Sequence, residues 1–308
     1  MTTELPKSNG NKPEVKITTP LANRVRASGP ILILAILFVV ASFLTWYFTW
    51  FGRDLSESEI SQYLVDDKHP RHVQHALLQV QQRIERGEKS AKQWYPQILA
   101  LAGSPEPEFR LTVAWLMGTD NSSEAFHNAL KKLLEDQEPI VRRNAALALV
   151  RFNDPSGRKE LIAMLQPFTV NAPAAGVLLN SLSPGAQISR GALLGRIQPP
   201  NGEVIEMRSP LLGKVDRTPV ANGSSVTAGD ALLTIKSDEQ SIWEALRGLA
   251  IIGQEQDLPL IERYASATEP ESERIRQQAS QTANAIKSRQ NKTQLFAKQA
   301  EEVGDPAM

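Results

Sequence analysis

The feature that most constrains the fold is an internal repeat with a period of 32 residues. The segment Glu106–Arg110, EPEFR, recurs as EPIVR at Glu138–Arg142, and apolar positions follow both copies at matching distances. A further copy lies downstream, where residues 244–253 match residues 144–153 at an offset of 100. A repeat of this length is typical of solenoids, in which each unit buries its apolar face against the next unit.

Helical periodicity accompanies the repeat from about residue 70 onward. Apolar residues recur with the 3.6-residue period of a helix, and breaks rich in Gly, Pro, Asp and Ser separate the periodic segments. Small side chains such as Ala145 and Ala245 let neighbouring helices approach closely. We therefore expect paired helices with tight turns, spanning residues 72–86, 91–102, 108–118, 124–135, 139–152 and 157–165.

The repeated segments resemble HEAT repeats of the short bacterial, lyase-associated type. The best copies are EPIVRRNAALALVRFNDPSGRKELIAML from Glu138 and SIWEALRGLAIIGQEQDLPLIERYA from Ser241. The resemblance implies helical repeats over residues 70–167 and again over residues 238–288. Such solenoids mostly present surfaces to protein partners, so the resemblance implies binding and says almost nothing about reaction chemistry.

A segment of different periodicity interrupts the repeats. Ala145 and Ala245 are 100 positions apart, where one repeat needs 32, and over residues 168–237 the apolar period changes from 3.6 to 2. This segment repeats the motif G-x-x-[IV]-x-x-G, which begins at Gly185 and again at Gly223. Paired glycines supply positive φ at turns. The expected fold is therefore mainly α with an inserted all-β domain made of two similar halves.

The doubled motif, together with SPLLGKVDRTPVANGSSVTAGDALLTI over residues 209–235, resembles two related families. One is the biotinyl/lipoyl-carrier fold, and the other is the lipoyl-like barrel-sandwich domain of periplasmic adaptor (membrane fusion) proteins. The carrier resemblance implies a modified lysine at the tip of the hairpin that joins the halves. That tip, residues 198–203, contains no lysine, and Lys214 and Lys236 lie elsewhere. We therefore assign no cofactor, and a carrier role stays the alternative.

The adaptor resemblance is also incomplete. Adaptors of this family usually carry a long helical hairpin at the tip, and the six residues 198–203 are too few to form one. The docking mode of that family is therefore not carried over to this chain.

An uncharged apolar run, Ile31–Phe51, precedes the repeats. At about 1.5 Å per residue it matches the roughly 30 Å hydrocarbon core of a bilayer. Trp46, Tyr47 and Trp50 lie at its C-terminal end, as in an interfacial aromatic belt. The sequence predicts a single-pass transmembrane helix at residues 30–51. The alternative, a cleaved signal peptide, has a shorter apolar core and a small-residue cleavage site.

The flanking charges predict the orientation of that helix. Basic residues dominate the segment before it and acidic residues the segment after it, which favours a cytoplasmic N-terminus and an extracytoplasmic bulk. In a bacterium this corresponds to the inner membrane and the periplasm. We expect residues 1–29 to be a disordered cytoplasmic tail, residues 52–69 a linker and residues 289–308 a polar C-terminal tail.

Composition limits the chemistry and the partners. The chain has no cysteine, which excludes disulfides, thiolate catalysis and cysteine-ligated zinc. Its 34 basic and 34 acidic residues give a net charge of zero, which disfavours nucleic-acid binding. Serines lack a G-x-S-x-G context, and no phosphate loop is present. We therefore expect a chain that is not an enzyme.

Histidines form the one pattern in the sequence whose spacing could bind a metal ion. His69, His72 and His75 read H-x-x-H-x-x-H at the start of the first expected repeat helix. Imidazoles three residues apart share a helix face and can hold a metal with outside ligands. His69 precedes Pro70 and is expected off the helix, and no carboxylate completes an obvious triad. Solvated histidines are the simpler interpretation, so we assign no metal ligands; His127 is isolated.

Two further groups are candidates for partner contacts. A basic cluster surrounds one repeat, and its alternatives are a solvated face or a surface for an anionic partner; its members are Arg142, Arg143, Arg151, Arg158 and Lys159. Three tryptophans, Trp94, Trp115 and Trp243, lie on helix faces and are expected to be core or partner contacts.

These observations predict a membrane-anchored, non-catalytic scaffold or adaptor. Its partners would be protein subunits of an envelope complex that serves transport, secretion or the assembly of a membrane complex. The alternatives are a biotinyl/lipoyl-type carrier and a chromophore-lyase-like repeat protein. The sequence assigns no catalytic, cofactor-binding or metal-binding residue to any of these roles.

Overall fold

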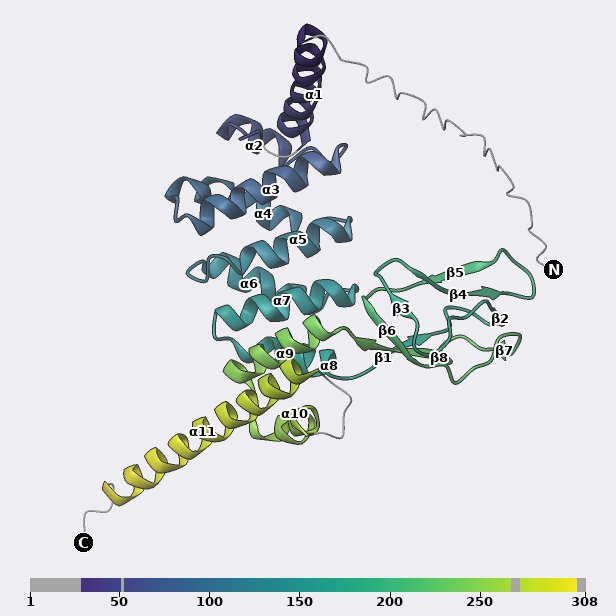
Figure 1. Cartoon of the computed structure of the whole chain (residues 1–308). Helices are drawn as coiled ribbons and strands as arrows, with labels where there is room; N and C mark the ends of the chain where they lie inside the picture. The colour runs from purple at the N-terminus through teal and green to yellow at the C-terminus, as the bar shows by residue number, and fades with distance from the viewer. Residues whose placement is uncertain (1–28, 51–52, 267–271, 304–308) are drawn as a thin grey trace, which may run out of the picture. The chain divides into compact units, whose positions relative to one another are not determined.

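The computed structural model describes residues 29–50, 53–266 and 272–303 (Figure 1). The chain divides into two compact units, with the boundary between Asp54 and Leu55. Helix α1 (Gly29–Trp50) belongs to the first unit, and the remaining helices and all described strands belong to the second. The described residues are mostly helical with a small antiparallel sheet region, in agreement with the predicted fold class.

Helix α1 coincides with the apolar run, and its described side chains, such as Ile31 and Phe38, are exposed. Within the described residues, however, no helix is both long enough and apolar enough to cross a membrane. The predicted transmembrane helix at 30–51 is thus unsupported, and its aromatic belt lies outside the described side chains.

The second unit begins with helix pairs stacked in chain order (Figure 1). Most helices agree with the predicted spans to within a few residues; the span 91–102 is a 3-10 turn, Lys89–Trp94, followed by a shorter α-helix. The helices are α2 (Glu57–Tyr63), α3 (Pro70–Glu85), α4 (Tyr95–Leu101), α5 (Pro107–Met117), α6 (Glu124–Leu133), α7 (Pro139–Arg151), α8 (Arg158–Met164), α9 (Glu239–Ile252), α10 (Leu258–Ala265) and α11 (Glu273–Val303).

Hydrogen bonds reproduce the 32-residue repeat. Arg110 and Arg142 hold equivalent positions in α5 and α7, and each donates from Nη1 to two backbone carbonyls that precede its own helix. Each of these helices also begins with proline, where the missing N–H costs nothing. The acceptors are Ser104 and Pro105 for the first arginine, at 2.9 and 3.2 Å, and Asp136 and Gln137 for the second, at 2.7 and 3.0 Å.

The helical core continues across the segment that interrupts the repeats. Val150 of α7 and Leu161 of α8 belong to the same buried cluster as Ile242 and Leu246 of α9. Helix α9 therefore packs on α7 and α8 as the next repeat would, although the residues of the sheet region lie between them in sequence. A stack of this kind is stabilised by apolar burial between neighbouring units.

Between α8 and α9 the chain forms two four-stranded antiparallel sheets, ordered β1-β8-β6-β3 and β5-β4-β2-β7. The two halves interlock, because β3 of the first half pairs with β6 of the second and β7 of the second pairs with β2 of the first. The strands are β1 (Phe168–Asn171), β2 (Gly176–Leu179), β3 (Gln187–Ile188), β4 (Leu193–Gln198), β5 (Ile205–Arg208), β6 (Gly213–Arg217), β7 (Ser225–Val226) and β8 (Ala231–Ser237).

The doubled glycine motif forms the turns that make this exchange possible. The four motif glycines, Gly185, Gly191, Gly223 and Gly229, have φ of 91°, 78°, 84° and 92°, which confirms the predicted positive φ. Each glycine pair flanks one of the two short exchanged strands, and the apolar residue midway between the glycines, Ile188 or Val226, is buried. The motif thus encodes a short strand with a sharp turn at each end.

We predict that Gly157→Ala destabilises the helical stack. A Cβ at residue 157 would lie 2.7 Å from the Cα of Ala146 and 3.0 Å from its carbonyl oxygen, and both are backbone atoms that cannot rotate away. Overpacking of this kind costs about 1–3 kcal/mol of unfolding free energy. Chemical denaturation monitored by circular dichroism measures the loss.

The matched control is Gly103→Ala, in an exposed turn of the same stack. A Cβ there would lie 3.7 Å from the nearest atom, an ordinary van der Waals distance. We expect little change or a small gain in stability from the control. Equal losses in both variants would contradict the proposed packing of Gly157 on α7.

Candidate functional site

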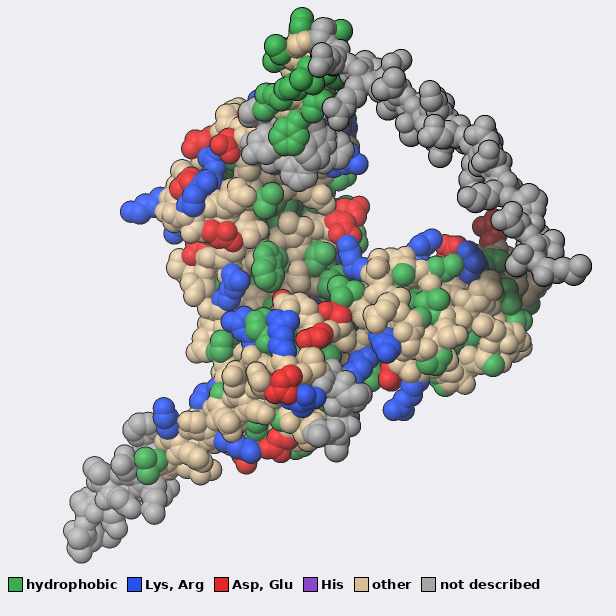
Figure 2. All heavy atoms as spheres, viewed as in Figure 1, with side chains coloured by type: hydrophobic (Ala, Val, Ile, Leu, Met, Phe, Trp, Pro, Cys, Tyr) green, Lys and Arg blue, Asp and Glu red, His purple; other side chains and the backbone are tan. Residues whose placement is uncertain are grey.

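Helices α5, α7 and α9 are neighbours in the stack, and together they form a groove of about 240 Å³ on the surface. On the face seen in Figure 2, hydrophobic side chains lie beside Lys and Arg side chains over this part of the helical stack. The residues that shape the groove are Trp115 from α5, Leu147 and Arg151 from α7, and Trp243, Arg247 and Ile251 from α9. We call this surface the Trp115–Trp243 groove.

Arginine side chains hold both tryptophan rings of the groove. The guanidinium carbon of Arg151 lies 5.4 Å from the centroid of Trp115, and Arg151 also donates to the carbonyl of Gly118 at 3.2 Å. The guanidinium carbons of Arg247 and Arg274 lie 4.7 and 4.1 Å from the ring of Trp243. Each such cation–π contact contributes about 0.5–1 kcal/mol at an exposed site, so the rings are restrained before any partner arrives.

The groove leaves apolar surface exposed. Trp115 is 42% exposed and Ile251 is 51% exposed, although both lie on helices whose opposite faces form the core. Tryptophan and arginine are enriched among the hot-spot residues that contribute most of the binding energy in protein interfaces. Trp94, the third tryptophan of interest, is instead fully buried and donates from Nε1 to Ser61.

The predicted basic cluster does not form one surface. Arg142 lies near Glu160 as well as the carbonyls described above, and Arg158 pairs with Asp257 through two contacts of 2.7 and 2.5 Å. Arg143 is buried, and burial lowers the pKa of its guanidinium. Arg151 is the member that contributes to the groove. These residues are neighbours only in sequence, because the helices direct their side chains to different partners.

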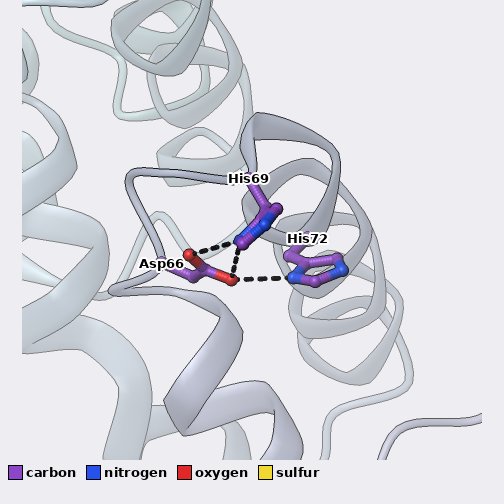
Figure 3. Close-up of side chains that lie close together, drawn as sticks. All are labelled: Asp66, His69 and His72. Atoms are coloured by element: carbon purple, nitrogen blue, oxygen red, sulfur yellow. Dashed lines mark hydrogen bonds and ion pairs between the residues drawn. The ribbon is translucent and has the colours of Figure 1, made fainter.

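The histidine pattern behaves partly as expected. His69 precedes α3 as its N-cap residue, which confirms its predicted place off the helix. Asp66, His69 and His72 come together, with Nδ1 of His69 and Nδ1 of His72 at 2.9 and 2.8 Å from Asp66 Oδ2 (Figure 3). The expectation that no carboxylate completes a triad is therefore wrong, because the turn before α3 brings Asp66 back to the helix start.

The other two histidines lie apart from this cluster. Nε2 of His75 faces Nε2 of Gln79 at 2.9 Å, one turn further along α3. His127, expected to be isolated, contacts Asp154 at 2.5 Å and stacks on the ring of Phe152.

The lysines of the sheet region do not occupy a carrier position. Lys214 on β6 and Lys236 on β8 are cross-strand partners, whereas the turn that joins β4 to β5 contains no lysine. The ammonium of Lys236 lies 6.0 Å from the ring centroid of Tyr264. Both lysines are therefore held on strands, in contrast to the exposed hairpin tip that the carrier resemblance implies.

Comparisons with known proteins identify the helical repeats. Residues 95–175 match the family model of HEAT repeats, which confirms HEAT-type repeats over that part of the chain, whereas the lyase-associated type stays a prediction. The resemblance of residues 168–237 to lipoyl-like domains remains a prediction. No curated protein matches the chain.

One solved structure, that of a single-chain, multi-domain long-chain acyl-CoA carboxylase, shows partial similarity. The identity is 19%, the alignment covers 30% of this chain and 9% of that chain, and the TM-score is 0.22. This chain thus matches a small part of that protein's length, and a similarity this weak supports no inference about fold or function.

We predict that Asp154 makes the stability of the stack depend on acid pH. Burial would raise the pKa of its carboxyl, but hydrogen bonds from Ser156, His127 and Lys131 outweigh burial and hold that pKa well below its usual range. A depressed folded pKa stabilises the protein above the unfolded value of about 3.9, and this stabilisation is lost as pH falls through the folded pKa. Asp154→Asn should lower the unfolding free energy at pH 7 by about 2 kcal/mol.

Denaturation curves between pH 7 and pH 3 test this prediction. The wild-type chain should lose stability on acidification more steeply than Asp154→Asn, because the variant has no carboxylate to protonate. Glu135→Gln, at an exposed carboxylate in the turn between α6 and α7, is the control and should retain the wild-type slope. An unchanged slope in Asp154→Asn would contradict the assignment.

Proposed function

We propose that this chain is a non-catalytic scaffold or adaptor whose helical repeats bind a protein partner in the Trp115–Trp243 groove. The observation that carries the proposal is the pair of tryptophans restrained by arginines on an otherwise mixed polar surface. The HEAT-repeat match supports the same class of function, because such repeats generally mediate protein–protein contacts.

The groove favours a partner segment that combines apolar and acidic side chains. Ile251 and the two tryptophan rings offer apolar area, which a leucine- or phenylalanine-sized side chain would cover. Arg151, Arg247 and Arg274 surround this area with positive charge, which outweighs the carboxylate of Glu244 in the lining. A carboxylate from the partner would gain charge-assisted hydrogen bonds from these arginines.

We propose further that the apolar run Ile31–Phe51 anchors the repeats at the bacterial inner membrane, with residues 52–308 outside the cytoplasm. The support is the uncharged run Ile31–Phe51 with basic residues before it and acidic residues after it. The partner would then be a subunit of an envelope complex for transport, secretion or membrane assembly. In this proposal the sheet region, which resembles lipoyl-like adaptor domains, presents a second binding surface and carries no prosthetic group.

Site-specific crosslinking in cells tests the groove directly. A photoreactive residue at position 251 should capture one defined protein, whereas the same residue at position 78 should not. Leu78 on α3 is the matched control, because its exposed fraction, 51%, equals that of Ile251. Capture of the same protein at both positions would contradict the groove as the binding surface.

The purified complex then gives a quantitative prediction. Ile251→Glu places a carboxylate in the apolar part of the groove and should weaken partner binding by about 30-fold or more, the factor that corresponds to about 2 kcal/mol at an interface hot spot. Leu78→Glu should leave the dissociation constant within about twofold. Calorimetry with the partner identified by crosslinking measures both values, and equal effects of the two variants would refute the proposal.

Protease treatment of spheroplasts tests the location. Protease added outside the cytoplasmic membrane should digest residues 52–308 and spare a cytoplasmic control protein. Protection of these residues in intact spheroplasts, followed by digestion after lysis, would refute the extracytoplasmic placement.

A further inference from the structure

The cluster before α3 has the composition of a metal site. Asp66 comes from the turn that follows α2, His69 is the residue just before α3, and His72 lies in the first turn of α3. One ligand atom from each of the three side chains lies within 4.8 Å of the other two. Figure 3 shows both imidazole rings presenting Nδ1 to the same carboxylate.

The distances are close to those of a tetrahedral zinc site. Zinc binds imidazole nitrogen and carboxylate oxygen at about 2.0–2.2 Å, so ligand atoms in a tetrahedron lie about 3.3 Å apart. Here Nδ1 of His69 and of His72 lie 2.9 and 2.8 Å from Asp66 Oδ2. A metal ion in place of these two hydrogen bonds would therefore require the oxygen–nitrogen pairs to separate by only a few tenths of an ångström.

The surrounding backbone and one aromatic ring hold the ligands in place. The N–H of His69 donates to the carbonyl of Asp66 at 3.2 Å, and the N–H of His72 donates to the carbonyl of His69 at 2.8 Å. The ring of Tyr63 stacks on the ring of His72, with centroids 4.3 Å apart and planes within 9°. Restrained ligands lose little conformational entropy on binding, which favours metal affinity.

The site is open on one side. The side chains of His69 and His72 are 63% and 41% exposed, so water or an outside ligand can reach the cluster. Three protein ligands with an accessible fourth position are typical of zinc sites that retain water. Two imidazoles also select against magnesium and calcium, which prefer oxygen ligands.

We propose that Asp66, His69 and His72 form a zinc-binding site whose fourth position is filled by water or by a ligand from outside the chain. The proposal is independent of the Trp115–Trp243 groove, which lies on other helices. Its test therefore gives the same answer whether or not the groove binds a partner.

Calorimetric titration of the untagged, full-length, metal-free chain with zinc chloride tests the site. We expect saturable binding of one zinc ion per chain. His69→Ala and His72→Ala should each weaken binding by at least tenfold, since even changes to outer-shell partners of metal ligands typically cost 10–100-fold. His75→Ala is the matched control and should change the affinity by less than twofold, because His75 contacts Gln79 and lies outside the cluster.

A second readout separates ligand loss from misfolding. The side chain of His69 makes no capping hydrogen bond to α3, so His69→Ala should retain the wild-type circular dichroism and melting temperature without metal. Cobalt(II) added to the wild-type chain and to His75→Ala should give the visible absorption of a tetrahedral site, and His69→Ala should not. Absence of saturable binding, binding that survives both cluster variants, or equal loss in His75→Ala would overturn the proposal.

Discussion

Apolar burial between successive helix pairs is the interaction on which the rest of the second unit depends. A single pair has one apolar face that is too large to leave in water, and the next pair covers it. As a result, side chains from three helices meet in one buried cluster, for example Val150, Leu161 and Leu246. The close approach leaves no room for a Cβ at Gly157, where the backbone of Ala146 is in contact.

The stack accommodates the sheet region because the first and last strands of that region lie side by side. Strand β1, which follows α8, pairs with β8, which precedes α9, and Phe168 is the register partner of Ile235. The chain therefore leaves the stack and returns to it side by side, so α9 can pack where the next repeat belongs. An ion pair between Arg190 and Glu108 connects the sheet region to α5 at a second point.

The same stacking creates the groove that we propose as the partner surface. Trp115 and Leu147 are equivalent positions in successive repeats, and Arg247 is the equivalent position in α9. A position that faces outward in one repeat faces outward in all of them, so the side chains line up across helices that are far apart in sequence. Restraint of the tryptophans by arginines limits the conformational entropy that the groove loses on binding.

The candidate sites show what sequence reasoning misses. The H-x-x-H spacing pointed to His69 and His72, but no metal ligands were assigned from the sequence, because His69 lies before the helix and no carboxylate was evident nearby. Asp66 was missed, since its side chain reaches the cluster through an irregular turn that carries no periodic signal. The basic residues, in contrast, do not form one surface, because neighbouring residues on a helix point in different directions. Arg158, for example, pairs with Asp257, which lies 99 residues away in sequence.

The amino-acid sequence by itself determined the local elements of this protein. Periodicity, prolines at helix starts and glycines with positive φ act over a few residues, so the helices and the glycine turns could be predicted from the chain alone. Tertiary structure alone decided which elements meet: the exchange of β3 and β7, the packing of α9 on α7, and the groove between Trp115 and Trp243. These contacts join residues distant in sequence, and they form because burial against a particular neighbour lowers the free energy of the whole chain.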